Sequence, residues 1–325
     1  MKISVIIPAY NAAATVEAAV RSVLAQTVAP SQILVMDDGS TDETSQRLQA
    51  FESRITVLRQ ANRGVAHARN VLCGQATGEI IAFLDADDVW HPAYLETQVA
   101  MLERHPEAVA GITGHVTFHA PGSYRWDTQS SDTKLSMEKI EPADFLKRYN
   151  QDPGSFGSPS FCCIPKKVLA QMGQEPFPVS ISGADDFYLM NILPLYGPVV
   201  YSREPRVAYR VTAGSISSNQ LKSVRLAVNA FELLAKIYQG LPGRSHAQTF
   251  QLAFASKRRQ YAKFLMGVNQ PAEARKQLKS ALANPGGLLS LLKTFGVLLS
   301  TYLTPSFQPR WPGPHRESTA TKQLA

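Results

Sequence analysis

Three carboxylates follow one strongly apolar segment of this 325-residue chain. Ile80–Leu84 has the composition of a buried strand, and Asp85, Asp87 and Asp88 come after it. Like charges this close together repel one another unless a cation lies among them. Oxygen ligands select a hard cation such as Mg²⁺ or Mn²⁺, and Mg²⁺ is commonly shared between one or two carboxylates and the phosphates of a substrate. The pattern therefore predicts a divalent-metal site.

A second acidic run occupies residues 36–44 and also follows an apolar segment. Its later residues, from Ser40 to Glu43, can cap a following helix and favour the positive end of that helix. Capping does not explain Asp37 and Asp38, which lie at the tip of the preceding strand. A carboxylate in this place can accept hydrogen bonds from a base imide or from ribose hydroxyls, so we predict a nucleoside-binding role for Asp38.

Two further polar segments can contribute to the same site. Residues 60–70 contain a turn and the start of a helix, with Arg69 on its inner face. Asp185 and Asp186 open an apolar helix. Acids at a helix N-terminus often serve only as partners of the helix dipole, but a carboxylate there also stays ionised, as a general base must. Both interpretations of this pair are open at this point.

The elements that must position these residues alternate between short β-branched runs and helical patterns, which is typical of an α/β domain with a mostly parallel central sheet flanked by helices. We expect strands, each buried on both faces, at Ile3–Ile7, Gln32–Met36, Ile55–Arg59 and Ile80–Leu84. Helices are expected at Ala13–Gln26, Asp42–Phe51, Val65–Cys73 and after Pro92. Ligands of such sheets bind at the carboxyl ends of the strands, where the polar segments fall.

The pattern is less regular from about residue 106 to residue 220. Further strands are expected at Val109–Phe118, Ser160–Ile164, Val199–Tyr201 and Val207–Val211. Loops rich in Pro, Gly and Ser join them, and we expect this part to shape the pocket of a second substrate. The three cysteines are an odd number and two are adjacent, which argues against a disulfide framework or a four-ligand zinc site and fits a cytoplasmic protein.

Charge divides the chain into an acidic and a basic part. Residues 1–220 hold 18 Lys or Arg and 23 Asp or Glu, whereas residues 221–325 hold 15 and three. Within the basic, helical part, apolar residues of Gly287–Leu303 recur at helical spacing with polar residues on the other side. We expect this helix to lie either on an anionic membrane surface, the inner face of the cell membrane, or on the protein's own core.

Together, and in this order, the segments of residues 1–220 resemble the family 2 inverting glycosyltransferases with the GT-A fold. The shared stretches are Val5–Asn11, Asp37–Asp42, Asn62–Asn70, Gly78–Asp88 and Tyr209–Ser217. The resemblance implies transfer of a sugar from a nucleotide-diphosphate sugar, first of all a UDP-sugar, to an acceptor hydroxyl. It also implies a carbohydrate or lipid-linked glycan acceptor, in cell-surface polysaccharide or glycolipid biosynthesis.

The resemblance assigns roles to single residues. Those implied to bind the nucleotide are Pro8, Tyr10, Asn11, Asp38, Gly64, Arg69 and Asp85. Asp85 and Asp87 match the DXD pair that holds Mg²⁺ or Mn²⁺, Asp186 matches the general base, and Asp185 matches the acid before it.

Three positions need a comment beside this assignment. Trp90, just past the metal acids, is expected to be either a stacking platform for the acceptor sugar or a core anchor. Ala184 separates the acid pair from Gly183, and Thr212 stands where many relatives have a histidine that serves the metal.

The expected organisation has three parts. Residues 1–220 would form the GT-A domain, with a nucleotide-binding part at 1–105 and an acceptor-side part at 106–220. Residues 221–304 would form the basic helical region, and residues 305–325, which are polar and rich in proline, a disordered tail.

Two other functions compete with glycosyl transfer. The run from Asp85 to Val89 also fits the nucleophile motif of haloacid-dehalogenase phosphatases, although that motif normally lies on the first strand of its domain. The second alternative is a sugar-nucleotide-binding protein without catalysis. A dinucleotide oxidoreductase lacks its glycine-rich fingerprint here, and no recognised nucleic-acid-binding module accompanies the basic residues.

Overall fold

The computed structural model describes residues 1–119, 123–126, 136–211, 219–239, 247–283 and 286–303. The chain divides into two compact units, Met1–Ala253 and Phe254–Ala325. Two sequence expectations, the tail at 305–325 and the metal-site position of Thr212, lie outside the described residues.

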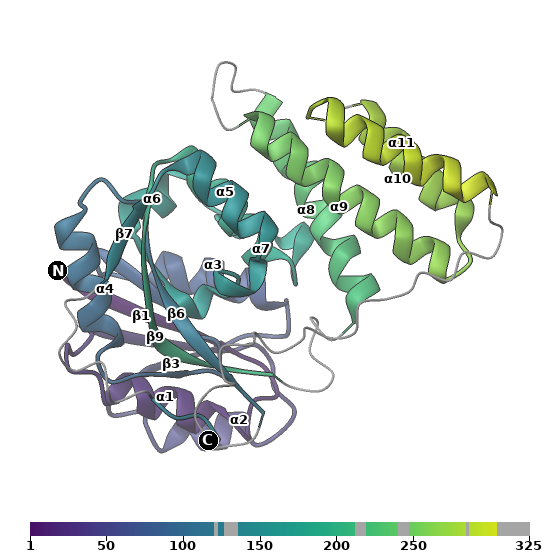
Figure 1. The fold of residues 1–325 in the computed structure, drawn as a ribbon. Helices are drawn as coiled ribbons and strands as arrows, with labels where there is room; N and C mark the ends of the chain where they lie inside the picture. The colour runs from purple at the N-terminus through teal and green to yellow at the C-terminus, as the bar shows by residue number, and fades with distance from the viewer. Residues whose placement is uncertain (120–122, 127–135, 212–218, 240–246, 284–285, 304–325) are drawn as a thin grey trace, which may run out of the picture. The chain divides into compact units, whose positions relative to one another are not determined.

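One sheet forms the centre of the first unit (Figure 1). Its order in the described residues is β3-β2-β1-β4-β8-β6-β9-β5, and β7 pairs with β9. The strands are β1 (Ile3–Ala9), β2 (Gln32–Asp37), β3 (Thr56–Arg59), β4 (Ile80–Phe83), β5 (Val89–Trp90), β6 (Ala110–Phe118), β7 (Met137–Ile140), β8 (Cys162–Pro165) and β9 (Val199–Arg210).

The strands β1 to β4 are parallel, as their alternation with helices predicts. Every residue of β1 is buried, in keeping with its central place between β2 and β4. The expectation that all four strands are buried on both faces is wrong for β3, whose residues are half-buried or exposed because β3 is an edge strand.

The remaining strands add antiparallel pairs, so that the sheet as a whole is mixed. β8 is antiparallel to both β4 and β6, and β9 is antiparallel to both β5 and β7 but parallel to β6. β9 is one long strand where the sequence predicts two short ones. An irregular register opposite Gly114 accommodates it, and a side chain at Gly114 would meet the Arg203 carbonyl oxygen at 2.4 Å.

Helices cover both faces of the sheet. Figure 1 shows α1 and α2 on one side of it and α3 on the other. The helices of the first unit are α1 (Val16–Leu24), α2 (Thr44–Gln49), α3 (Val65–Gln75), α4 (Tyr94–Arg104), α5 (Pro142–Gln151), α6 (Lys166–Gln171), α7 (Asp185–Ile192) and α8 (Gln220–Gln239). The change of side follows from the topology, because the chain runs outward from β1 to β3 and then returns to place β4 on the other side of β1.

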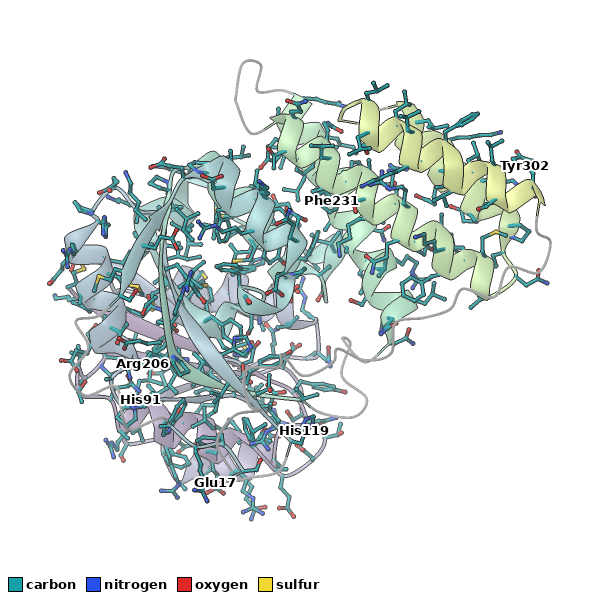
Figure 2. The ribbon with its side chains drawn as sticks, viewed as in Figure 1. Glu17, His91, His119, Arg206, Phe231 and Tyr302 are labelled. Carbon is teal, nitrogen blue, oxygen red and sulfur yellow. The ribbon has the colours of Figure 1, made fainter. Side chains whose placement is uncertain are left out.

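The structure extends the first unit past residue 220, where the sequence predicts a boundary. The reason is the packing of α8 on α7. Figure 2 labels Phe231 of α8. Its ring lies 5.1 Å from that of Phe187, and the Tyr238 hydroxyl donates to the backbone carbonyl of Asn191 at 2.8 Å. α9 (Ala247–Gly267) begins in the first unit and continues into the second.

The described part of the second unit is helical, as predicted. It contains the end of α9, then α10 (Pro271–Ala283) and α11 (Leu288–Leu303). Within the described residues, no helix has both the length and the apolar character that crossing a membrane requires.

Candidate active site

The carboxyl ends of β1, β2 and β4 meet at one edge of the sheet. The Asp38 amide donates to the Ala9 carbonyl at 2.8 Å, and the Leu84 amide donates to the Ile6 carbonyl at 3.1 Å. The strand order reverses at β1, and ligands of open α/β sheets bind at such a switch point. The structure thus brings together the two acidic runs that the sequence places about 45 residues apart.

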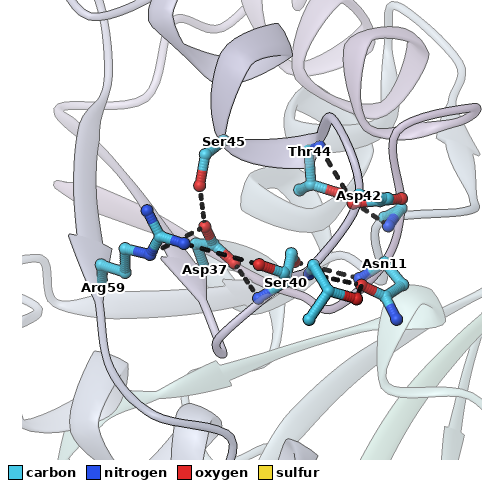
Figure 3. Close-up of polar contacts among 9 residues, drawn as sticks. Asn11, Asp37, Ser40, Asp42, Thr44, Ser45 and Arg59 are labelled. Carbon is cyan, nitrogen blue, oxygen red and sulfur yellow. Dashed lines mark hydrogen bonds and ion pairs between the residues drawn. The ribbon is translucent and has the colours of Figure 1, made fainter.

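The loop after β2 is held by side chains that the sequence offered as site residues (Figure 3). Asn11, with a φ of 47°, accepts a hydrogen bond from the Thr41 amide at 2.9 Å. Asp37 accepts from the amide of Ser40 at 2.9 Å and from the hydroxyl of Ser45. Asn11 and Asp37 therefore position the loop through their side-chain oxygens.

Asp42 does more than favour the positive end of α2. Its carboxylate accepts from the Thr44 amide at 3.0 Å and from the Ala13 amide at 3.1 Å, which ties the loop after β2 to the loop after β1. These hydrogen bonds to the carboxylate lower the pKa of Asp42, although the little burial it has acts in the opposite direction.

Asp38 holds the turn that leads into α3. Its carboxylate accepts from the side-chain amide of Gln60 at 2.7 Å and from the backbone amides of Arg63 and Gly64 at 3.0 and 2.8 Å. Gly64 has a φ of 87°, a backbone conformation that residues other than glycine rarely adopt. Three of about four acceptor positions of the carboxylate are used, so one is left for a ligand.

Pro8 and Tyr10 lie beside this turn, at the end of β1. Pro8 is buried within the strand and pairs with Met36. Tyr10, directly past the strand, is 50% exposed. An exposed aromatic ring next to the Asp38 turn is a suitable surface for a nucleoside base.

Arg69 is buried and bridges two halves of the site. Its Nη2 donates to Asp85 and its Nη1 donates to Asp185, 116 residues further along the chain. Burial alone would lower the pKa of Arg69, but the charges of Asp85 and Asp185 outweigh it and raise that pKa. The sequence predicts a nucleotide contact for Arg69, whereas the structure engages its guanidinium with the two carboxylates.

The three acids after β4 do not point to one place. Asp88 is buried and accepts from the Arg210 amide at 3.0 Å, while Asp85 and Asp87 stay partly exposed. Burial raises the pKa of Asp87 to about 6, and the charge of Asp85 acts in the same direction. Two guanidinium groups supply positive charge nearby. Arg69 donates to Asp85, and Nε of Arg210 donates to the Asp87 carbonyl at 2.9 Å.

Asp85 and Asp87 fit a divalent cation. Both are partly exposed carboxylates, and burial together with the charge of Asp85 disfavours ionisation of Asp87, which a cation between the two would favour. Among the described residues, no three His, Cys, Asp or Glu side chains are grouped as a metal site. Further ligands would therefore be phosphate oxygens and water, as is common for Mg²⁺.

The acid pair at the start of α7 divides into a fixed and an open carboxylate. Asp185 is 2% exposed, accepts from the Gly183 amide at 2.9 Å and binds Arg69. Asp186 is partly exposed and accepts from the Phe187 amide at 2.6 Å. Burial raises the pKa of Asp186 to about 7, with the charge of Asp185 adding to the effect. A carboxylate of this pKa is suited to take a proton near neutral pH.

Of the two roles expected for Trp90, the structure shows the core anchor and contradicts stacking on an acceptor sugar. Trp90 is 2% exposed, and its ring stacks on Tyr94 with the centroids 4.1 Å apart. Its indole nitrogen donates to the Ser160 carbonyl at 2.9 Å. A buried indole with a satisfied N–H anchors the strand end from inside the protein.

Three positioning residues were missed by the sequence interpretation. Ser160 accepts from the Asp85 amide at 2.9 Å, and Arg210 binds Asp88 and the Asp87 carbonyl through its backbone and side chain. Asn70 exchanges two hydrogen bonds, of 2.7 and 3.0 Å, with the backbone of Phe177, whose ring lies 5.7 Å from the Arg69 guanidinium. The available signal was that Asn70 and Arg210 lie within stretches shared with the family, Asn62–Asn70 and Tyr209–Ser217.

Asn70→Ala should lower the free energy of unfolding by about 1–3 kcal/mol, because it leaves the amide and carbonyl of Phe177 without their partners. Chemical denaturation of both proteins measures this difference. Asn150→Ala is the control for loss of an asparagine side chain away from the site, because it removes hydrogen bonds to the Leu146 carbonyl and to the Asn191 side chain but none to the site. Equal stability of Asn70→Ala and the parent would show that the two hydrogen bonds between Asn70 and the Phe177 backbone do not stabilise the fold.

The family model of Glycosyl transferase family 2 matches residues 4–173, more than half of the chain. This chain belongs to glycosyl transferase family 2. It is 44% identical over 234 residues to the Escherichia coli UDP-Glc:alpha-D-GlcNAc-diphosphoundecaprenol beta-1,3-glucosyltransferase WfgD. The aligned residues cover 69% of this chain and 82% of WfgD. It is thus a glycosyltransferase, and the phosphatase alternative is set aside.

Two more comparisons extend this result. TuaG of Bacillus subtilis, named for teichuronic acid biosynthesis, is 37% identical over 147 residues, which span 40% of this chain and 58% of TuaG. The crystal structure of S. aureus TarS 1-349 superposes with a TM-score of 0.70 at 19% identity, over 94% of this chain and 90% of that one. The expected GT-A fold is thereby confirmed.

Proposed function

We propose that this enzyme transfers a sugar, with inversion, from a UDP-sugar to a hydroxyl of a lipid-linked glycan acceptor during cell-surface polysaccharide synthesis. WfgD, by its name, uses UDP-Glc and a diphosphoundecaprenol-linked acceptor, and TarS has been crystallised in complex with UDP-GlcNAc. The observation that carries the mechanism is the contrast at α7, where Asp185 is fixed by Arg69 and Asp186 is left open.

The donor site would lie at the ends of β1, β2 and β4. The exposed ring of Tyr10 would take the nucleoside base, and the fourth acceptor position of Asp38 would take an N–H or hydroxyl of the nucleoside. Asp85 and Asp87 would hold the divalent cation. When bound, this cation offsets the negative charge that grows on the departing diphosphate.

Asp186 would act as the general base. Its open carboxylate takes the proton of the acceptor hydroxyl as that oxygen attacks the anomeric carbon, a contribution of about 10²–10⁴ in rate. Asp185 acts differently, because both of its oxygens are engaged and it fixes the start of α7. A base and a leaving group on opposite faces of the sugar make the displacement single and inverting.

A thermal-shift screen of sugar nucleotides, with and without Mn²⁺, tests the donor side. We expect a UDP-sugar to raise the melting temperature only with the cation present, in keeping with stabilisation by a bound ligand. Release of UDP on addition of a polyprenyl-diphosphate-linked sugar then tests transfer. Donor binding without UDP release on any acceptor would support instead the non-catalytic sugar-nucleotide-binding protein.

The pH dependence of kcat/KM should report Asp186. Its folded pKa of about 7 lies above the ordinary value because of burial and the charges of Asp185 and Asp85, against which Arg69 acts. Burial, and then the charge of Asp186, raises the pKa of Tyr149. Because the base must be ionised, kcat/KM should fall about tenfold for each pH unit below about 7 and level off above it. A flat profile from pH 5 to 8 would exclude Asp186 as the base.

A further inference from the structure

Helix α11 is turned the opposite way from an ordinary surface helix. Surface helices of globular proteins bury their apolar stripe and expose their polar one. In α11 the polar residues Ser290, Thr294 and Thr301 are buried. The structure shows that most of the predicted polar side faces the protein, but it corrects two positions: Leu298, predicted on the apolar side, is buried, and Lys293, predicted on the polar side, is exposed.

Hydrogen bonds within the second unit fix this rotation. Nη1 of Arg259 donates to the Ser290 hydroxyl at 2.8 Å and to the Thr294 hydroxyl at 2.9 Å. Nη2 of Arg275 donates to the Thr301 carbonyl at 2.9 Å. Turning α11 to bury its apolar side would break these bonds to buried polar groups, which is costly.

The opposite side of α11 is a continuous apolar surface, here called the α11 face. Its large side chains are 46% to 72% exposed. They are Leu288, Leu289, Leu292, Phe295, Leu299 and Tyr302. Their spacing of three and four residues places them in one stripe, which ends at Tyr302 near the C-terminal end of the helix (Figure 2). Exposed stripes of this kind mark interaction surfaces.

The charge around the α11 face indicates what covers it. Residues 254–303 hold eight Lys or Arg side chains and one acid, Glu273. Lys293 on α11 is exposed, as are Lys276 and Lys279 on α10. A second copy of this chain would bring the same positive charge against them. An anionic bilayer instead offers an apolar interior to the stripe and negative headgroups to the lysines.

We propose that the α11 face lies in the interface of an anionic lipid bilayer, parallel to the membrane plane. α11 has 16 residues and carries no acid, as suits a helix that lies in the interface. Lys293 on the same helix and the net positive charge of the second unit favour contact with the negative headgroups. Attachment of this kind places the enzyme on the surface that carries its acceptor, a consequence that rests on the proposed function.

Co-sedimentation with vesicles tests the proposal on the full chain. The protein should co-sediment with phosphatidylcholine vesicles that contain phosphatidylglycerol, but not with pure phosphatidylcholine vesicles. High salt should release it from the anionic vesicles. The triple variant Leu292→Gln, Phe295→Gln, Leu299→Gln should lose about tenfold or more in apparent affinity, because it removes three apolar anchors. Its melting temperature should stay unchanged, since these side chains are exposed.

Leu252→Gln is the matched control, because Leu252 is an exposed leucine at 40% outside α11, and this variant should bind as the parent does. Phe295→Trp gives a second readout: its fluorescence, after subtraction of the parent spectrum, should shift to the blue on anionic vesicles. Absence of that shift, or equal binding by the triple variant, overturns the proposal.

Two further outcomes separate the alternatives. If light scattering without lipid shows a parent dimer that the triple variant converts to a monomer, the α11 face is an interface between copies and the membrane proposal is overturned. Asp186→Asn, which removes the proposed base, should bind vesicles like the parent. Membrane binding and glycosyl transfer can therefore fail independently of each other.

Discussion

Asp87→Ala should abolish glycosyl transfer and cation-dependent binding of the sugar nucleotide. The variant removes one of the two carboxylates that fit the cation, and charge stabilisation of this kind contributes several kcal/mol, or about 10³-fold or more in rate. The fold should remain intact. Above about pH 6 Asp87 is ionised although burial and Asp85 disfavour its charge, so alanine should raise the melting temperature there.

Turnover and nucleotide-induced thermal shifts, each with and without Mn²⁺, measure both effects. Asp144→Ala is the matched control, because Asp144 is an exposed aspartate in the first turn of α5, away from the strand ends. Near-normal turnover of Asp87→Ala would show that the metal assignment is wrong. Wild-type activity that survives EDTA would show the same.

Asp186→Asn should separate chemistry from binding. Donor affinity should stay within a few-fold of the parent value, because Asp186 is assigned to the acceptor side. The value of kcat should fall by about 10² or more, as expected on loss of a general base. Titration with the UDP-sugar by calorimetry and single-turnover kinetics measure the two quantities separately.

Asp185→Asn provides the comparison. Asp185 is buried, binds Arg69 and accepts from the Gly183 amide, so its change should lower stability as well as activity. Loss of one partner of a buried ion pair costs about 3–5 kcal/mol. A stable, inactive Asp185→Asn beside an active Asp186→Asn would exchange the two roles.

Local patterns were sufficient to predict the frame of the site. The buried strands β1, β2 and β4 follow from apolar runs, and polar residues directly after such runs fall at one edge of a parallel sheet. The sequence therefore predicts that Tyr10, Asp38 and Asp85 lie at the same edge of the sheet.

Contacts between distant segments were beyond the reach of these patterns. The residues around Arg69 do not indicate that its partner is Asp185, 116 residues further along the chain. Trp90 shows a related limit. The side chain of a residue that follows a polar run can point into the core or into solvent, and for Trp90 the packing on Tyr94 fixes it in the core. In α11, periodicity shows which residues share a side, but the choice of buried side depends on Arg259 and Arg275.

Under the proposed function, the bridge made by Arg69 would couple the two substrates of this enzyme. One guanidinium holds Asp85 on the donor side and Asp185 beside the proposed base. A ligand that competes for Asp85 frees part of that guanidinium for Asp185, so occupancy on one side alters the energy of the other. Reciprocity then requires donor and acceptor to change each other's affinity by the same factor. The strength of that mutual effect would then depend on a single buried side chain.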